Sequence, residues 1–151
     1  MAIEGMDPKS KEDISAASEQ APTLDTELQY DEALELVKAL LREGVINASN
    51  LTSTGNSLGG GLAAYAGLNI GIKTITFNAA GVHPDNVGPH TDMVTIYFMS
   101  EDSRMQEKHP WLPEAIGNRI MVSPAPDDRK LGEVGRHFIG PMQRALEWWG
   151  M

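Results

Sequence analysis

The sequence contains no cysteine among its 151 residues. Disulfide bonds, thiolate catalysis and cysteine-type metal sites are therefore excluded. Basic residues are also scarce, because 12 lysines and arginines stand against 21 acidic residues and give a formal net charge of −9. That balance argues against a nucleic-acid partner, since phosphate backbones are bound by clusters of lysine and arginine.

Long hydrophobic runs are absent as well. No apolar stretch approaches the roughly 20 residues that a membrane-spanning helix needs. The first 20 residues, MAIEGMDPKSKEDISAASEQ, lack a basic start followed by an apolar segment, and so they do not resemble a Sec-type signal peptide. The sequence predicts synthesis in the cytoplasm and leaves open export by another route, as an effector would require.

The chain divides by composition into two parts. Residues 1–24 are small, polar and acidic-leaning, which predicts a disordered polar leader. Residues 25–151 are long enough for one domain with a hydrophobic core. Within that domain, apolar residues at helical spacing predict a helix in LQYDEALELVKALLREG and another, near the C-terminus, in GPMQRALEWWG.

Strand patterns alternate with these helices. β-Branched and apolar residues predict strands at about 51–54, 73–77 and 93–99 and a short one in NRIMVSP. This alternation predicts an α/β fold with a small, largely parallel sheet flanked by helices.

The segment TGNSLGGGLAAYAG, residues 54–67, carries the strongest functional signal. Gly55-Asn56-Ser57-Leu58-Gly59 lies between a predicted strand and a small-residue helix, which is the context of a Gly-x-Ser-x-Gly nucleophile elbow. There the backbone N–H of Leu58 would point at a developing oxyanion. Five residues alone also fit a glycine-rich turn with Ser57 as a helix N-cap. A phosphate-binding loop fits less well, because no Lys-Ser/Thr pair follows the glycines.

A serine nucleophile needs a base and an orienting acid, which follow it along the chain in the order acid, then histidine. VTIYFMSEDSRM places Glu101 and Asp102 just past a predicted strand. His83 and His90 precede both acids, and His109 follows them too closely. His137 lies ahead of the last helix, where the base is expected.

Four segments in this order resemble a lipase-like α/β-hydrolase family that includes class 3 lipases and bacterial phospholipase A1-type effectors. They are TGNSLGGGLAAYAG, TITFNAAGVHP, VTIYFMSEDSRMQ and LPEAIGNRIMVSPA. The resemblance covers about residues 29–148 and implies a Ser57–Asp102–His137 triad. It selects Asp102 over Glu101, because the family acid follows the strand tyrosine, here Tyr97, by five residues. Asn78, in FNAAG, is expected only to end a strand beside the serine.

Two departures from the family pattern stand out. Asn56 occupies a position where the family usually has histidine, although that position lies outside the triad. The family's upstream strand and its arginine-glycine loop, which supplies a second oxyanion donor, have no visible counterpart before residue 29. The core therefore looks truncated, and its open edge predicts a homo-oligomer or a partner chain that completes the sheet.

Two functions follow from these observations. The first is a serine carboxylic-ester hydrolase, lipase or phospholipase A1-like, that acts on a lipid or ester substrate without a metal or organic cofactor. The second is a catalytically weak hydrolase-fold fragment that acts as a partner-binding or assembly module. The sequence itself does not name the acyl chain or the head group.

Overall fold

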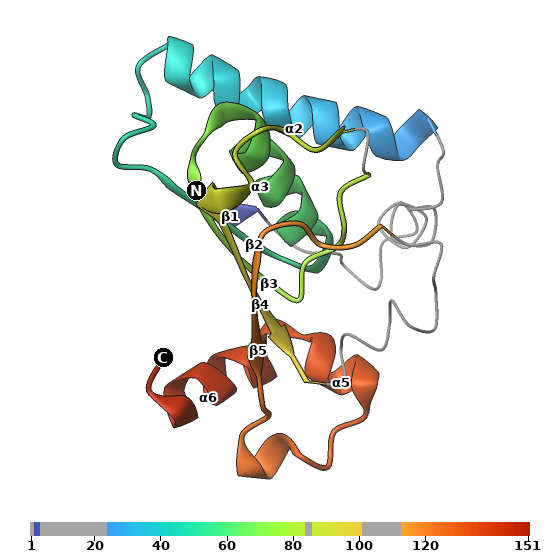
Figure 1. Ribbon diagram of the computed structural model, residues 1–151. Coiled ribbons are helices and arrows are strands. Elements are labelled where there is room, and N and C mark those ends of the chain that lie inside the picture. Colours follow the sequence, from blue (N-terminus) through green and yellow to red (C-terminus); the bar gives the residue numbers. More distant parts are fainter. Residues whose placement is uncertain (1, 4–23, 84–85, 101–112) are drawn as a thin grey trace.

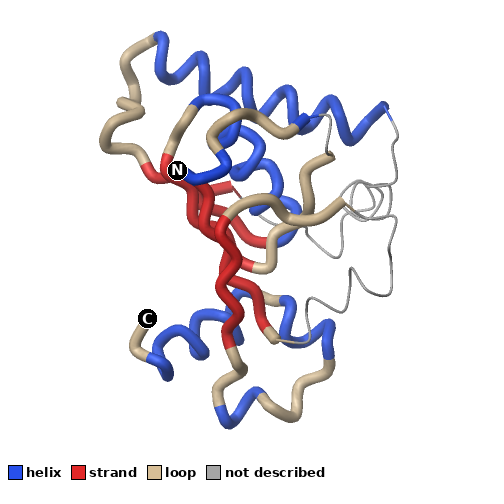
Figure 2. The backbone as a smooth tube through the Cα atoms, in the orientation of Figure 1, coloured by secondary structure: helices blue, strands red, loops and turns tan. Residues whose placement is uncertain are grey.

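A five-stranded parallel sheet forms the centre of the molecule (Figures 1 and 2). The computed structural model describes residues 2–3, 24–83, 86–100 and 113–151. The strands lie in the order β1 (Ala2–Ile3), β2 (Thr52–Asn56), β3 (Lys73–Phe77), β4 (Val94–Met99) and β5 (Asn118–Val122). All four neighbouring pairs are parallel, so the carboxyl ends of the strands share one edge of the sheet.

Two long helices cover one face of this sheet. α3 (Ser57–Ile70) packs on β2 and β3, and α2 (Leu24–Arg42) packs on α3 (Figure 1). The hydrophobic core that these helices form with the sheet contains the fully buried Leu68, Ile72 and Ile96. α2 ends at Arg42, and two residues later Gly44 takes a φ of 69°, the left-handed conformation in which glycine commonly follows a helix.

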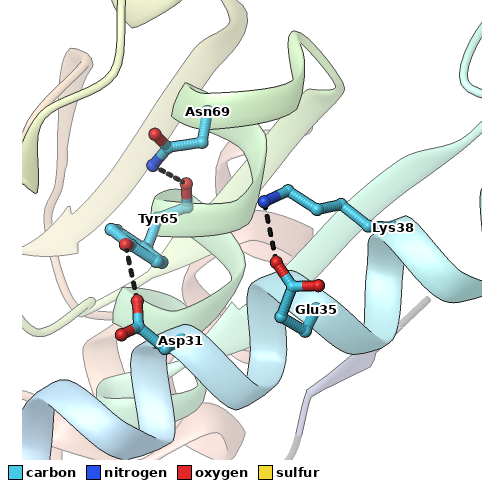
Figure 3. A network of polar contacts seen from close by, with 5 residues as sticks. All are labelled: Asp31, Glu35, Lys38, Tyr65 and Asn69. Atoms are coloured by element: carbon cyan, nitrogen blue, oxygen red, sulfur yellow. Dashed lines mark hydrogen bonds and ion pairs between the residues drawn. The ribbon is translucent and has the colours of Figure 1, made fainter.

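Polar contacts between α2 and α3 fix how the two helices lie together (Figure 3). The Tyr65 hydroxyl donates to Asp31 at 3.0 Å, and the rings of Tyr30 and Tyr65 meet edge to face. Tyr30 also donates from its hydroxyl to the Gly81 carbonyl at 3.0 Å, and burial raises its pKa. The Lys38–Glu35 pair in the same view lies on the exposed side of α2.

The opposite face of the sheet is covered by C-terminal elements. α5 (Glu133–His137) and α6 (Ile139–Trp149) follow the short 3₁₀ turn η3 (Pro126–Asp128) (Figure 1). A second apolar cluster forms there, with Met99 and Val122 from the sheet and Met142 and Ala145 from α6. A further 3₁₀ turn, η2 (Thr91–Met93), leads into β4. Within the described residues no helix is long and apolar enough to span a membrane.

The predicted fold class is confirmed, and so are the four predicted strands. β3 has the predicted bounds, and β2 runs two residues further than expected, up to the elbow. One helix prediction is wrong in part. The helical spacing of Met142, Ala145, Leu146 and Trp149 predicts one buried stripe on α6, but the Trp149 side chain is half exposed and donates through Nε1 to the Ser123 carbonyl.

The expectation of an open edge beside the elbow strand, with no strand before residue 29, is also wrong in part. Ala2 and Ile3 form β1 and pair in parallel with Thr54 and Gly55 of β2. Strand pairing uses backbone N–H and C=O groups, so the polarity of the rest of the leader does not prevent it. The sheet therefore has an upstream strand, although a very short one.

Candidate active site

Ser57 lies at a sharp turn between β2 and α3. β2 ends at Asn56, α3 begins at Ser57, and Ser57 has a φ of 53°. This left-handed conformation is costly for a residue with a side chain, by about 1–2 kcal/mol. Asn56, not Ser57, is the N-cap of α3. The geometry thus matches a nucleophile elbow rather than the alternative of an N-cap serine.

The glycines around Ser57 allow three close contacts. A Cβ on Gly55 would lie 2.2 Å from the Gly59 carbonyl oxygen. A Cβ on Gly60 would lie 2.8 Å from the Cβ of Ala79. A Cβ on Gly61 would lie 2.4 Å from the hydroxyl oxygen of Tyr30. Since real Cβ atoms do not come that close, the glycine run lets α3 pack directly on β2, on the segment after β3 and on α2.

The structure brings Ser57 and His137 together across 80 residues of sequence. The Oγ of Ser57 and the Nε2 of His137 lie 2.8 Å apart, which is hydrogen-bonding distance. Leu58 is the second residue of α3, and its side chain is buried. Backbone N–H groups in the first turn of a helix have no partner within the helix and carry its positive dipole end. This position suits an oxyanion donor.

The structure does not place the other candidate acids and histidines beside Ser57. Asp102, with the competing Glu101 and His109, lies outside the described residues. His83 and His90 are exposed. The His90 ring lies against Gly71, just after α3, whereas Ser57 begins that helix. A helix of 14 residues is about 21 Å long, so His90 is far from Ser57.

Two asparagines that sequence reasoning gave no functional role hold the backbone of His137. Asn78 donates through Nδ2 to the carbonyls of His137 at 3.0 Å and Arg136 at 3.2 Å. Asn56 donates through Nδ2 to the Phe77 carbonyl at 2.9 Å and to the His137 carbonyl at 3.5 Å. The sequence did indicate the position of Asn78, because this residue directly follows β3. It therefore lies at the same edge of the sheet as Ser57.

An ion pair joins the elements on either side of His137, η3 before it and α6 after it. Asp128, in η3, accepts two hydrogen bonds of 2.8 Å from Arg144 of α6. These hydrogen bonds lower the pKa of the nearly buried Asp128 carboxyl, and the positive charges of Arg144 and Lys130 act in the same direction. Arg136 is buried and donates to the Arg129 carbonyl, so it ties α5 to the same turn.

Metal binding has no candidate cluster in the described part of the chain, where no three histidine or acidic side chains come close enough to share an ion. At the site itself, Ser57 contributes a hydroxyl, His137 an imidazole and α3 the backbone N–H groups of its first turn. Such a set can perform proton transfer and nucleophilic attack.

Comparison with known proteins gives the family. The model of the Tle-like phospholipase domain, a phospholipase-like family, matches residues 1–98. The chain belongs to this family. The matched residues run from β1 into β4 and include Ser57, whereas Asp102 and His137 follow them.

A curated relative agrees with that assignment. The chain is 32% identical over 111 residues to a protein from Serratia liquefaciens named extracellular phospholipase A1. The similarity covers 64% of this chain and 34% of the relative, so the chain spans about a third of that protein's length. The predicted resemblance to lipases and phospholipases is confirmed at the level of the family.

Proposed function

We propose that this phospholipase-like chain is a serine carboxylic-ester hydrolase that cleaves an acyl ester of a phospholipid. The observation that carries the proposal is the strained Ser57 at the end of β2 with its Oγ 2.8 Å from Nε2 of His137. The name of the Serratia liquefaciens relative, a phospholipase A1, supports a phospholipid ester as substrate.

The proposed reaction uses a covalent acyl-enzyme. Ser57 Oγ attacks the ester carbonyl carbon while His137 Nε2 takes the hydroxyl proton. His137 then returns the proton to the leaving alcohol as the carbon–oxygen bond breaks. Water attacks the acyl-enzyme in the same way and releases the fatty acid. The Leu58 N–H stabilises the oxyanion, and Asp102 holds the imidazole in the required tautomer.

The strain at Ser57 supports this role. A serine that only capped a helix would have an extended backbone and would bond to an N–H of the first turn. Ser57 instead has a positive φ and directs its hydroxyl to a histidine from a distant segment. Strain of this kind concentrates at functional sites, where the surrounding packing maintains it.

A fluorophosphonate probe, which phosphonylates activated serines, tests the proposal. We expect the wild-type chain to be labelled and Ser57→Ala and His137→Ala to remain unlabelled. Ser49→Ala serves as the matched control and should keep full labelling, because Ser49 is exposed and hydrogen-bonds to Asn47 within the same turn. Hydrolysis of labelled phospholipids and p-nitrophenyl esters by the same variants then gives the substrate class.

The competing function makes the opposite prediction. If neither the wild type nor Ser57→Ala is labelled and no ester is hydrolysed, the hydrolase proposal is wrong. A partner-binding fragment of a larger phospholipase then becomes the better account, in line with the third of the relative's length that the chain spans.

A further inference from the structure

The backbone of His137 is held in part by contacts from distant segments of the chain. α5 is only five residues long, no side chain caps it, and the next residue, Phe138, is already extended at φ −71° and ψ 154°. So short a helix has little intrinsic stability. The orientation of the His137 ring toward Ser57 therefore depends on what anchors the end of α5.

Asn78 supplies that anchor. Its side chain is 3% exposed and its φ is 44°. Asparagine tolerates this left-handed conformation better than most residues. The conformation turns the chain at the end of β3 and directs the side-chain amide toward α5, where Nδ2 meets the carbonyls of Arg136 and His137.

The other end of the same amide contacts the sheet. Oδ1 of Asn78 accepts a hydrogen bond of 2.8 Å from the backbone N–H of Met99, the last residue of β4. The partners fix the orientation of the amide, since a flipped side chain would turn its oxygen toward two carbonyls and its NH₂ toward an N–H. One side chain thus links the end of α5 to the end of β4.

Asn56 adds a second and weaker contact. It occupies the N-cap position of α3 yet makes no side-chain cap, and it donates instead to Phe77 and, at 3.5 Å, to His137. The carbonyl of His137 is therefore approached by amides from the residue before Ser57 and from the residue after β3. Both links connect the candidate base to the sheet edge that carries the candidate nucleophile.

We propose that Asn78 is the positioning residue of the active site, which sets His137 against Ser57 by holding the His137 carbonyl and the Met99 N–H with one amide. The inference rests on the proposed hydrolase function. Because Asn78 is buried, we assign it a positioning role and not direct contact with substrate.

Two variants separate the amide from the backbone conformation. Asn78→Gly keeps a φ of 44° without strain and removes both functional ends of the side chain. Asn78→Asp keeps the shape of the side chain but replaces the NH₂ donor with an oxygen. Asn69→Ala is the matched control, because Asn69 donates through Nδ2 to the Tyr65 carbonyl on α3, away from His137.

We expect Asn78→Gly and Asn78→Asp to lower kcat for p-nitrophenyl butyrate by about 100-fold, the effect of a misplacement of about 1 Å, with KM changed less than about 2-fold. Asn69→Ala should keep the wild-type kcat. In a His137→Ala background, Asn78→Gly should leave the residual rate unchanged, because a residue that acts through His137 has no further effect once the imidazole is gone.

Three results would overturn the positioning role. The first is wild-type kcat in both Asn78 variants. The second is an equal loss of rate from Asn78→Gly with and without His137, which would mark a general structural role. The third is equal rates for the wild type and Ser57→Ala, which would reject the hydrolase function and the positioning role with it. Circular dichroism melting of each variant identifies one that fails to fold, and the other Asn78 variant then decides.

Discussion

At the scale of single residues, the sharp strand-to-helix turn at Ser57 was predictable and the amide contacts around it were not. Gly55 and Ser57 are local signals, because a tight strand-to-helix turn requires a small residue at one position and a strained residue at the other. The partners of Asn78 lie 21 to 59 residues further along the chain. Only the fold brings such groups together, so the sequence could show that Asn78 ends a strand but not what it holds.

The proposed role of Asp102 as the acid can be tested against the neighbouring Glu101. We expect Asp102→Asn to lower turnover by about 10⁴-fold, since a neutral amide no longer holds the imidazole in the required tautomer. Glu101→Gln should change turnover little. Ester hydrolysis at saturating substrate measures both effects. A larger loss from Glu101→Gln than from Asp102→Asn would transfer the role of the acid to Glu101.

At the scale of elements, long periodic segments were predictable and short ones were not. α2 has apolar residues at helical spacing, and β3 and β4 largely alternate between buried and more exposed positions. α5 and η3 have five and three residues, too few to show a period, and yet they position His137. Their stability comes from tertiary contacts, such as the Asp128–Arg144 pair between η3 and α6.

The Asp128–Arg144 pair predicts a dependence of stability on pH. Hydrogen bonds from Arg144 lower the pKa of Asp128 in the folded state below the unfolded value of 3.8. The stabilisation is thus fully present above that value and is lost as the pH falls through the folded pKa. We expect Asp128→Asn to lower the urea midpoint at pH 7 and to remove part of the decline in stability below about pH 4.

Glu35→Gln is the control for that measurement. Glu35 pairs with Lys38 on the exposed side of α2, where both side chains are about half exposed or more. Ion pairs of this kind contribute little, typically below about 0.5 kcal/mol. Equal effects of Asp128→Asn and Glu35→Gln on the urea midpoint at pH 7 would show that the η3–α6 link does not stabilise the fold.

At the scale of the whole molecule, the order of strand and helix patterns was enough to predict a parallel α/β sheet. The number of strands was not, because β1 has two residues and lies in a polar segment that its composition marks as disordered. The predicted homo-oligomer or partner-completed assembly assumed a bare β2 edge. β1 covers that edge at Thr54 and Gly55, so the oligomer remains a prediction that depends on β1.

Proline substitutions in β1 test this dependence. Successive residues of a strand direct their N–H groups to opposite sides, so replacing both Ala2 and Ile3 with proline removes whichever N–H faces β2. We expect the double variant to lose about 1 kcal/mol of stability for a broken hydrogen bond, roughly 2–4 °C in Tm. We also expect it to self-associate more than the wild type at the same micromolar concentration.

Thermal melts measure the change in Tm, and light scattering measures the self-association. A double valine variant at the same positions keeps both N–H groups and should match the wild type. If the proline variant melts at the wild-type temperature and stays monomeric, β1 does not protect the β2 edge. If the wild type itself forms a stable oligomer, the partner covers a different surface, and β5, at the other end of the strand order, is the first edge to examine.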